Sequence, residues 1–141
     1  MTAMKQRVHV LIVDREAHTR QGLQALLAAW PQIEVVGAAA NGVDAVQLVE
    51  KYRPDVALID IPTPAPAWSG AEGMDGLETI RRIKSQWPQV RIVVLAMYAT
   101  RRAAALAAGT DAFLLKGCPA QDVLDAIVNH VHPHVHPIGQ A

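Results

Sequence analysis

The sequence predicts an α/β protein with a doubly wound, five-stranded parallel sheet and helices on both faces. Five short apolar runs, rich in Val, Ile and Leu, alternate with stretches in which apolar residues recur at helical spacing. The runs are mostly apolar and do not alternate strictly between apolar and polar residues, which is typical of parallel strands that are covered on both sides. Of the 141 residues, 51% are hydrophobic and 18% are charged, so the chain can build one domain with a real core.

The first half of the chain contains three of these runs. We expect strands at 8–13, 33–39 and 55–59, and helices at 17–30 and 43–52. The first helix should end before Pro31, because proline cannot continue a helix, and Pro54 should end the second in the same way. Asn41 offers a side-chain oxygen that caps the start of the second helix.

The second half begins with a stretch of different character. Residues 61–73 are rich in proline and glycine and have no periodic pattern, so they predict a long loop. After it we expect helices at 77–87, about 100–108 and 119–131, and strands at 91–96 and 112–115. Gly109 should end the middle helix, and Pro119 suits the first turn of the last one. The expected domain is therefore 1–131, followed by a tail at 132–141.

Composition excludes several classes of protein. The 13 Lys+Arg and 13 Asp+Glu cancel, which gives no support for a general electrostatic grip on nucleic acid or on an anionic membrane. The single cysteine, Cys118, excludes an internal disulfide and is most simply a packing residue. No apolar run approaches the roughly 20 residues of a membrane span. We therefore expect a cytoplasmic protein.

Charged residues follow the expected strands. The first strand ends at Asp14 and Arg15, the third at Asp60, the fourth at Ala96 and the fifth at Lys116. Ligands of open parallel sheets bind outside the carboxyl ends of the strands, so these residues should share one edge. The simpler alternative is that they are solvated loop caps, but two carboxylates and an ammonium (Asp14, Asp60 and Lys116) at three strand ends favour a site.

Four stretches carry a resemblance to a known family. They are VLIVDREAHTRQGLQALL (10–27), RPDVALIDI (53–61), GMDGLETIRRIK (73–84) and AAGTDAFLLKG (107–117). With the order of strands and helices they cover about residues 7–130, and the chain resembles a response-regulator receiver domain of LuxR-type two-component regulators. This resemblance implies a flavodoxin-like fold with strand order 2-1-3-4-5 and a function in phosphorelay signalling rather than as an enzyme.

The resemblance also implies roles for single residues. Asp60 matches the phosphoacceptor, whose carboxylate attacks a phosphoryl group held on a partner's phosphohistidine. Lys116 matches the lysine that pairs with the acceptor or the phosphoryl group. Asp14 matches one member of an acidic pair that binds Mg²⁺ together with Asp60 and the backbone carbonyl at position 62, which is Pro62 here.

Three departures from the family pattern stand out. Arg15 replaces the second acid of the pair, so a metal ligand is lost and a positive charge is added. Ala96 replaces the Thr or Ser whose hydroxyl binds the phosphoryl oxygen, and Tyr98 nearby is expected to be a surface residue. The loop after Asp60 carries an insertion at 65–72, which could form a lid anchored by Trp68 or a solvated loop.

These departures suggest a degenerate receiver. Our hypothesis is that the Arg15 guanidinium pairs with Asp60 or Asp14 and takes the place of Mg²⁺. The protein would then be regulated by binding, or held in one state, rather than by phosphorylation. Expected partners are a sensor histidine kinase or another signalling protein, with a homodimer as a further expectation, and neither nucleic acid nor membrane.

Two questions stay open at this point. The competing function is a small-molecule or phosphate-binding enzyme on the same fold, which would also use Asp60 and Lys116. No DNA-binding helix-turn-helix follows within the sequence, so the chain is either a single-domain regulator or a receiver fragment of a longer protein. The alternating histidines His130, His132, His134 and His136 suit a metal, but a tail without function is the favoured interpretation.

Overall fold

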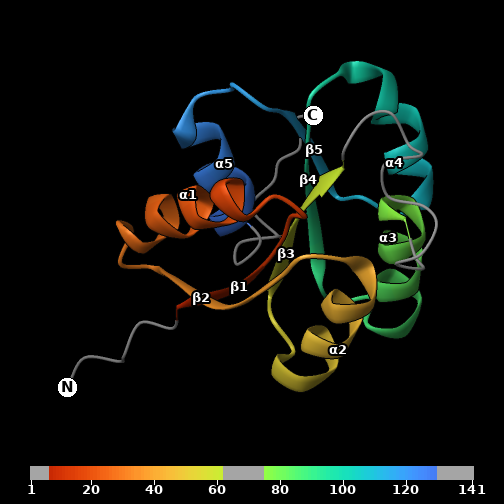
Figure 1. The fold of residues 1–141 in the computed structure, drawn as a ribbon, viewed down its shortest axis with the longest axis horizontal. Coiled ribbons are helices and arrows are strands. Elements are labelled where there is room, and N and C mark those ends of the chain that lie inside the picture. Colours follow the sequence, from red (N-terminus) through yellow and green to blue (C-terminus); the bar gives the residue numbers. More distant parts are fainter. Residues whose placement is uncertain (1–6, 62–74, 130–141) are drawn as a thin grey trace.

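The computed structural model describes residues 7–61 and 75–129 and shows a parallel sheet flanked by helices (Figure 1). Its five strands lie in the order β2-β1-β3-β4-β5, all parallel to their neighbours. They are β1 (Val8–Val13), β2 (Ile33–Ala39), β3 (Val56–Ile61), β4 (Arg91–Ala96) and β5 (Ala112–Leu115). The predicted fold class and strand order are therefore confirmed.

Helices connect each strand to the next within the described ranges. They are α1 (Ala17–Ala28), α2 (Gly42–Tyr52), α3 (Gly76–Gln86), α4 (Arg102–Ala108) and α5 (Ala120–Val128), with a 3₁₀ turn at Ala99–Arg101 before α4. Asn41 caps α2 as predicted, since its side chain accepts the N–H of Asp44. Gly109 ends α4 with φ 118°, a left-handed conformation that favours glycine. None of the helices described has the length and apolar character needed to cross a bilayer.

Several predicted boundaries were wrong, among them the end of the last helix, which was expected at 131 and lies at Val128. Two of the differences have a clear physical reason. The helix expected to reach Trp30 ends at Ala28, because the N–H groups of the next two residues bond three residues back and tighten the chain into a turn. The third strand was expected to end at residue 59, but it continues to Ile61. The extension is a consequence of pairing, since Asp60 and Ile61 lie opposite Leu95 and Ala96 of β4.

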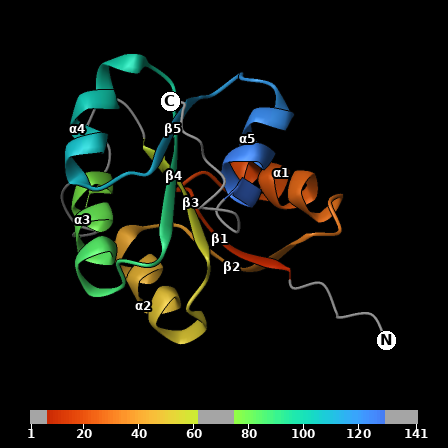
Figure 2. The same cartoon turned by 180° about the vertical axis from the view of Figure 1, so that it is seen from behind.

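The sheet separates two hydrophobic cores, and Figures 1 and 2 show the helices that cover them. Helices α2, α3 and α4 cover one face with buried side chains such as Val49, Ile80 and Ala105. Helices α1 and α5 cover the other face with Leu27, Leu124 and their neighbours. Successive residues of a strand point to opposite faces, so every strand of the sheet interior contributes to both cores.

This alternation sets the face on which the strand-end carboxylates lie. In β1, Val10 and Ile12 belong to the core under α1 and α5, and Asp14 follows two residues later. In β3, Val56 and Leu58 belong to the same core, and Asp60 continues that row. Because β1 and β3 are hydrogen-bonded neighbours, both carboxylates emerge on one face at one edge of the sheet.

Opposite that edge, a single ammonium group ties α3 to the start of β4 and to the loop before β5. The Nζ of Lys84 donates to the carbonyls of Pro88 (3.0 Å) and Val90 (2.8 Å) and lies 2.9 Å from Oδ2 of Asp111. The same carboxylate oxygen accepts the N–H of Ile92 at 2.8 Å. Three chain segments therefore depend on one half-buried ion pair.

Replacing this ammonium by an apolar group should destabilise the fold. We expect Lys84→Met to lower the free energy of unfolding by about 1–3 kcal/mol, because a partly buried carboxylate and two carbonyls lose their donor. Urea unfolding measures the change. The matched control is Arg82→Met, which removes an exposed cation 3.9 Å from Glu78 and should cost no more than about 0.5 kcal/mol. Equal losses in the two variants would contradict the role assigned to Lys84.

Candidate functional site

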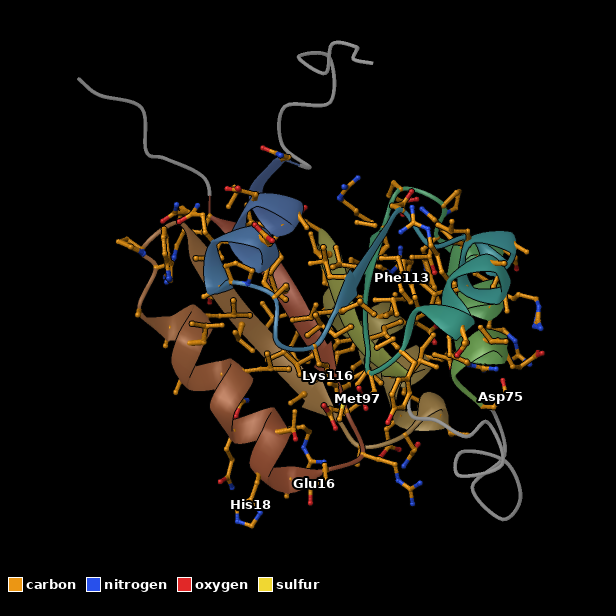
Figure 3. The ribbon with its side chains drawn as sticks, turned by 90° about the horizontal axis from the view of Figure 1, so that it is seen from above. Glu16, His18, Asp75, Met97, Phe113 and Lys116 are labelled. Atoms are coloured by element: carbon orange, nitrogen blue, oxygen red, sulfur yellow. The ribbon has the colours of Figure 1, made fainter. Side chains whose placement is uncertain are left out.

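The site begins with an ion pair between the ends of β3 and β5. Asp60 is the fifth residue of β3 and only 5% exposed, and its Oδ1 lies 2.5 Å from Nζ of Lys116. The contact is an ion pair without the directionality of a hydrogen bond. The backbone N–H of Lys116 donates to the carbonyl of Ala96 at 2.8 Å, which fixes the lysine at the end of β4. Figure 3 shows Lys116 beside Met97 at this edge.

Asp14 supplies a second buried carboxylate from the end of β1. Its side chain has no exposed surface, and its backbone N–H donates to Ala39 of β2 at 3.0 Å. Oδ1 accepts the N–H of Glu16 at 2.8 Å, which forms a turn leading into α1. Oδ2 is buried and has no hydrogen-bond partner among the residues described. The pocket thus contains a carboxylate oxygen that is removed from water and, within the described residues, makes no hydrogen bond in return.

The electrostatics of Asp14 show that the three charged groups share one environment. Burial raises the pKa of the Asp14 carboxyl above its ordinary value, and the hydrogen bond from Glu16 opposes this rise. The negative charge of Asp60 raises the pKa further, whereas the positive charges of Lys116 and Arg20 lower it. Charges affect one another in this way only over short distances, so Asp14, Asp60 and Lys116 lie close together. The ends of β1, β3 and β5 therefore converge.

Arg20 is a site residue that the sequence analysis missed. It lies in the first turn of α1, and its Nη1 donates to the backbone carbonyl of Asp14 at 2.8 Å. The guanidinium therefore holds the turn between β1 and α1 and adds a positive charge next to Asp14. The only available signal was its position one turn into the helix that follows Asp14, which does not by itself indicate a contact.

The residues that depart from the family pattern lie in different surroundings. Arg15 directly follows Asp14 and is exposed. Ala96 is fully buried in the core under α2, α3 and α4, where its methyl group provides no hydrogen-bond donor. Met97 and Tyr98 are more than half exposed, and Tyr98 is a surface residue as predicted.

Several other predictions concern residues away from the pocket or outside the described ranges. Cys118 is half-buried and packs against the core under α1 and α5, as expected for a packing residue, and burial raises the pKa of its thiol. Pro62, the insertion at 65–72 with Trp68, and the histidine tail lie outside the described residues.

The raised pKa of Asp14 makes the stability of the protein depend on pH. The folded state holds the Asp14 proton more tightly than the unfolded state, so this group favours folding at acid pH. Its contribution is lost as pH rises from the unfolded pKa through the raised folded pKa. We therefore expect Asp14→Asn to be stabilising relative to wild type at neutral pH, and less so in acid.

Urea unfolding of both proteins at neutral and at acid pH tests this expectation. Asparagine retains an oxygen that can accept the N–H of Glu16, so the turn should persist. Glu50→Gln, on the exposed part of α2, is the matched control and should leave the pH profile of wild type unchanged. The difference in free energy of unfolding between Asp14→Asn and wild type should grow as pH rises. If it does not, the buried negative charge of Asp14 does not destabilise the folded protein.

Comparison with known proteins identifies the family. The family model of the response regulator receiver domain matches residues 10–128. The transcriptional regulatory protein DegU of Brevibacillus brevis is 32% identical over 138 residues, covering 93% of this chain and 54% of the relative. The response regulator protein VraR of Staphylococcus aureus is 33% identical over 122 residues, covering 85% of this chain and 54% of the relative. The chain thus spans about half the length of these curated relatives.

Solved structures agree with the sequence relatives. The NarL signal receiver domain of Mycobacterium tuberculosis superposes with a TM-score of 0.76 at 27% identity, covering 88% of this chain and 95% of the other. The response regulator domain of CheB from Thermotoga maritima has a TM-score of 0.77 at 24% identity, covering 90% and 98%, and supports the fold alone. These matches show that the chain belongs to the response regulator receiver domain family of two-component signalling.

Proposed function

We propose that the chain works as a receiver module in which Asp60 occupies the phosphoacceptor position and Lys116 and Asp14 complete the pocket. The observation that carries this proposal is the ion pair between the buried Asp60 carboxylate and Lys116, with a second buried carboxylate beside it. Receiver domains are generally signalling modules rather than enzymes. The family match supports this function over the alternative of a small-molecule or phosphate-binding enzyme.

The chemistry of this arrangement is that of an acceptor held by a cation. A carboxylate oxygen of Asp60 would attack the phosphorus of a phosphohistidine on the partner kinase. The P–N bond breaks, and its electron pair returns to the imidazole. Charge gathers on the phosphoryl oxygens, and the ammonium of Lys116, already beside the acceptor, would stabilise that charge.

Receiver domains typically bind Mg²⁺ at the acidic phosphorylation site. The residues present here do not fit that ion well. Position 15 carries a guanidinium instead of a carboxylate, Oδ1 of Asp60 is engaged by Lys116, and no group of three or more acidic, His or Cys side chains within the described ranges could hold a metal. We propose that Asp14, Asp60 and the carbonyl of Pro62 retain only a weakened Mg²⁺ site, or none.

The partners follow from the same proposal. A sensor histidine kinase or another signalling protein would approach the pocket, and a second copy of the chain is a further partner. One structural neighbour from Staphylococcus aureus is a DNA-binding response regulator of the LuxR family. We propose that the residues of this chain contact neither nucleic acid nor membrane and act in the cytoplasm. The chain spans about half the length of its curated relatives, so the activities of the whole relatives are not assigned to it.

Restoring the family's acid at position 15 should restore the metal site. We expect Arg15→Asp to bind Mg²⁺ at least about tenfold more tightly than wild type, because a repelling charge is removed and an oxygen ligand is added. The measurement is a Mg²⁺ titration followed by the amide shifts of Asp14, Asp60 and Lys116.

Arg15→Gln separates the two effects, because it removes the charge without adding a carboxylate. Its gain in Mg²⁺ affinity should lie between those of wild type and Arg15→Asp. Saturable shifts in wild type at millimolar Mg²⁺, equal to those of Arg15→Asp, would disprove the weakened metal site.

A further inference from the structure

The ion pair at the acceptor position joins two strands that are not neighbours. Asp60 belongs to β3 and Lys116 follows β5, and β4 lies between them. Adjacent strands of a sheet are about 4.8 Å apart, so the lysine side chain must extend over the end of β4 to reach the carboxylate. The position of the ammonium therefore depends on the residues at the end of β4.

The strand register places Leu95 next to the ion pair. Leu95 lies opposite Asp60 in the pairing of β3 with β4. Its side chain belongs to the core under α1 and α5, which is the face on which Asp60 emerges. Leu95 is buried, so it lies on the side of the ion pair that is nearer to the core.

Met97 lies on the other side of the ion pair, towards solvent. It directly follows Ala96, whose carbonyl accepts the N–H of Lys116, so Met97 and the lysine lie at the same level of the sheet. The alternation of side chains along a strand assigns Met97 to the face of Leu95, two residues earlier. Figure 3 shows Met97 and Lys116 side by side at this edge.

The exposed fractions of these side chains agree with that arrangement. Met97 is 56% exposed, so a large part of its surface still contacts protein. The side chain of Lys116 is 31% exposed, and a lysine buries its methylene groups against apolar surface while its ammonium stays polar. Methionine suits such a contact, because its unbranched side chain adapts to the shape of its neighbour.

We propose that Met97 is a positioning residue of the acceptor site, which holds the side chain of Lys116 over the end of β4 and against Asp60. This inference rests on the proposed function and names a residue on which the same site depends. A lysine side chain has many rotamers, and this freedom must be lost when the ion pair forms. Apolar side chains on both sides of its methylene groups, Leu95 and Met97, limit that freedom in advance.

Acetylation of lysines measures how firmly Lys116 is held. Each protein is treated with N-hydroxysuccinimidyl acetate at one fixed pH, and mass spectrometry of its peptides gives the rate at each lysine. We expect Met97→Ala to raise the rate at Lys116 at least about threefold, because the ammonium leaves Asp60 more often. Met97→Leu keeps an apolar side chain of similar volume and should stay close to wild type.

Two controls accompany this measurement. The rate at Lys51, which is exposed on α2, is the internal reference and should be the same in every variant. Leu106→Ala is the matched control variant, because it also removes an exposed apolar side chain, from α4 on the opposite face of the sheet. It should leave the rate at Lys116 unchanged. Thermal unfolding establishes that each variant is folded at the temperature of the reaction.

Beryllofluoride binding then tests whether the position of the ammonium matters at the acceptor. The probe mimics a phosphoryl group when a carboxylate oxygen of Asp60 binds beryllium, and fluorine NMR in millimolar Mg²⁺ gives its dissociation constant. Met97→Ala should weaken binding at least about threefold, whereas Met97→Leu should not. The same comparison is made in Arg15→Asp, which carries the family's acid at position 15.

The outcomes separate this inference from the proposed function. An unchanged rate at Lys116 in Met97→Ala, or an equal increase in Leu106→Ala, overturns the role of Met97 and leaves the receiver function intact. A faster rate without loss of beryllofluoride affinity also overturns it, because the hold on Lys116 would then not serve the acceptor. Failure of wild type and Arg15→Asp to bind beryllofluoride would overturn the proposed function, whereas the acetylation rates would still decide whether Met97 holds Lys116.

Discussion

The ion pair between Asp60 and Lys116 is the interaction on which the site depends, and it exists because of the order of the strands. Asp60 belongs to β3 and Lys116 follows β5, with β4 between them. The lysine spans that gap because its backbone N–H is bound to Ala96 at the end of β4. A different strand order would leave the Asp60 carboxylate buried without a cation, which is far more costly than exposure.

The pocket also shows how a functional edge differs from a core in the same sheet. Asp60 lies on the same side of β3 as Val56 and Leu58. These two apolar side chains pack under α1 and α5. At the ends of β1 and β3 the row of side chains on this face continues with the buried carboxylates Asp14 and Asp60 in place of apolar side chains. Oδ2 of Asp14 has no hydrogen-bond partner in the described part of the chain, and a buried polar atom of this kind lowers stability, which is typical of functional sites.

The sequence was sufficient to predict the strands and the edge at which the charged residues meet, because apolar runs and strand ends are local signals. Asn41 and Gly109 were predictable in the same way, since a cap needs a particular side chain or a left-handed backbone. The last two residues of β3 could not be predicted from the sequence, because they belong to the strand only through their pairing with β4. Arg20 escaped for a related reason: its hydrogen bond to Asp14 depends on how α1 leaves the sheet, which no local pattern encodes.

The two substitutions that set this chain apart act through different parts of the structure. Arg15 is exposed and brings a positive charge to the residue after Asp14, whereas Ala96 is buried in the core under α2, α3 and α4. The carbonyl of Ala96 still accepts the N–H of Lys116, so the backbone part of the site survives and only a hydroxyl is lost. Binding of a ligand at Asp60 and a change of conformation in the segment after β4 therefore depend on different groups. A ligand bound at Asp60 would therefore lie next to the ammonium of Lys116 and would find no hydroxyl at position 96.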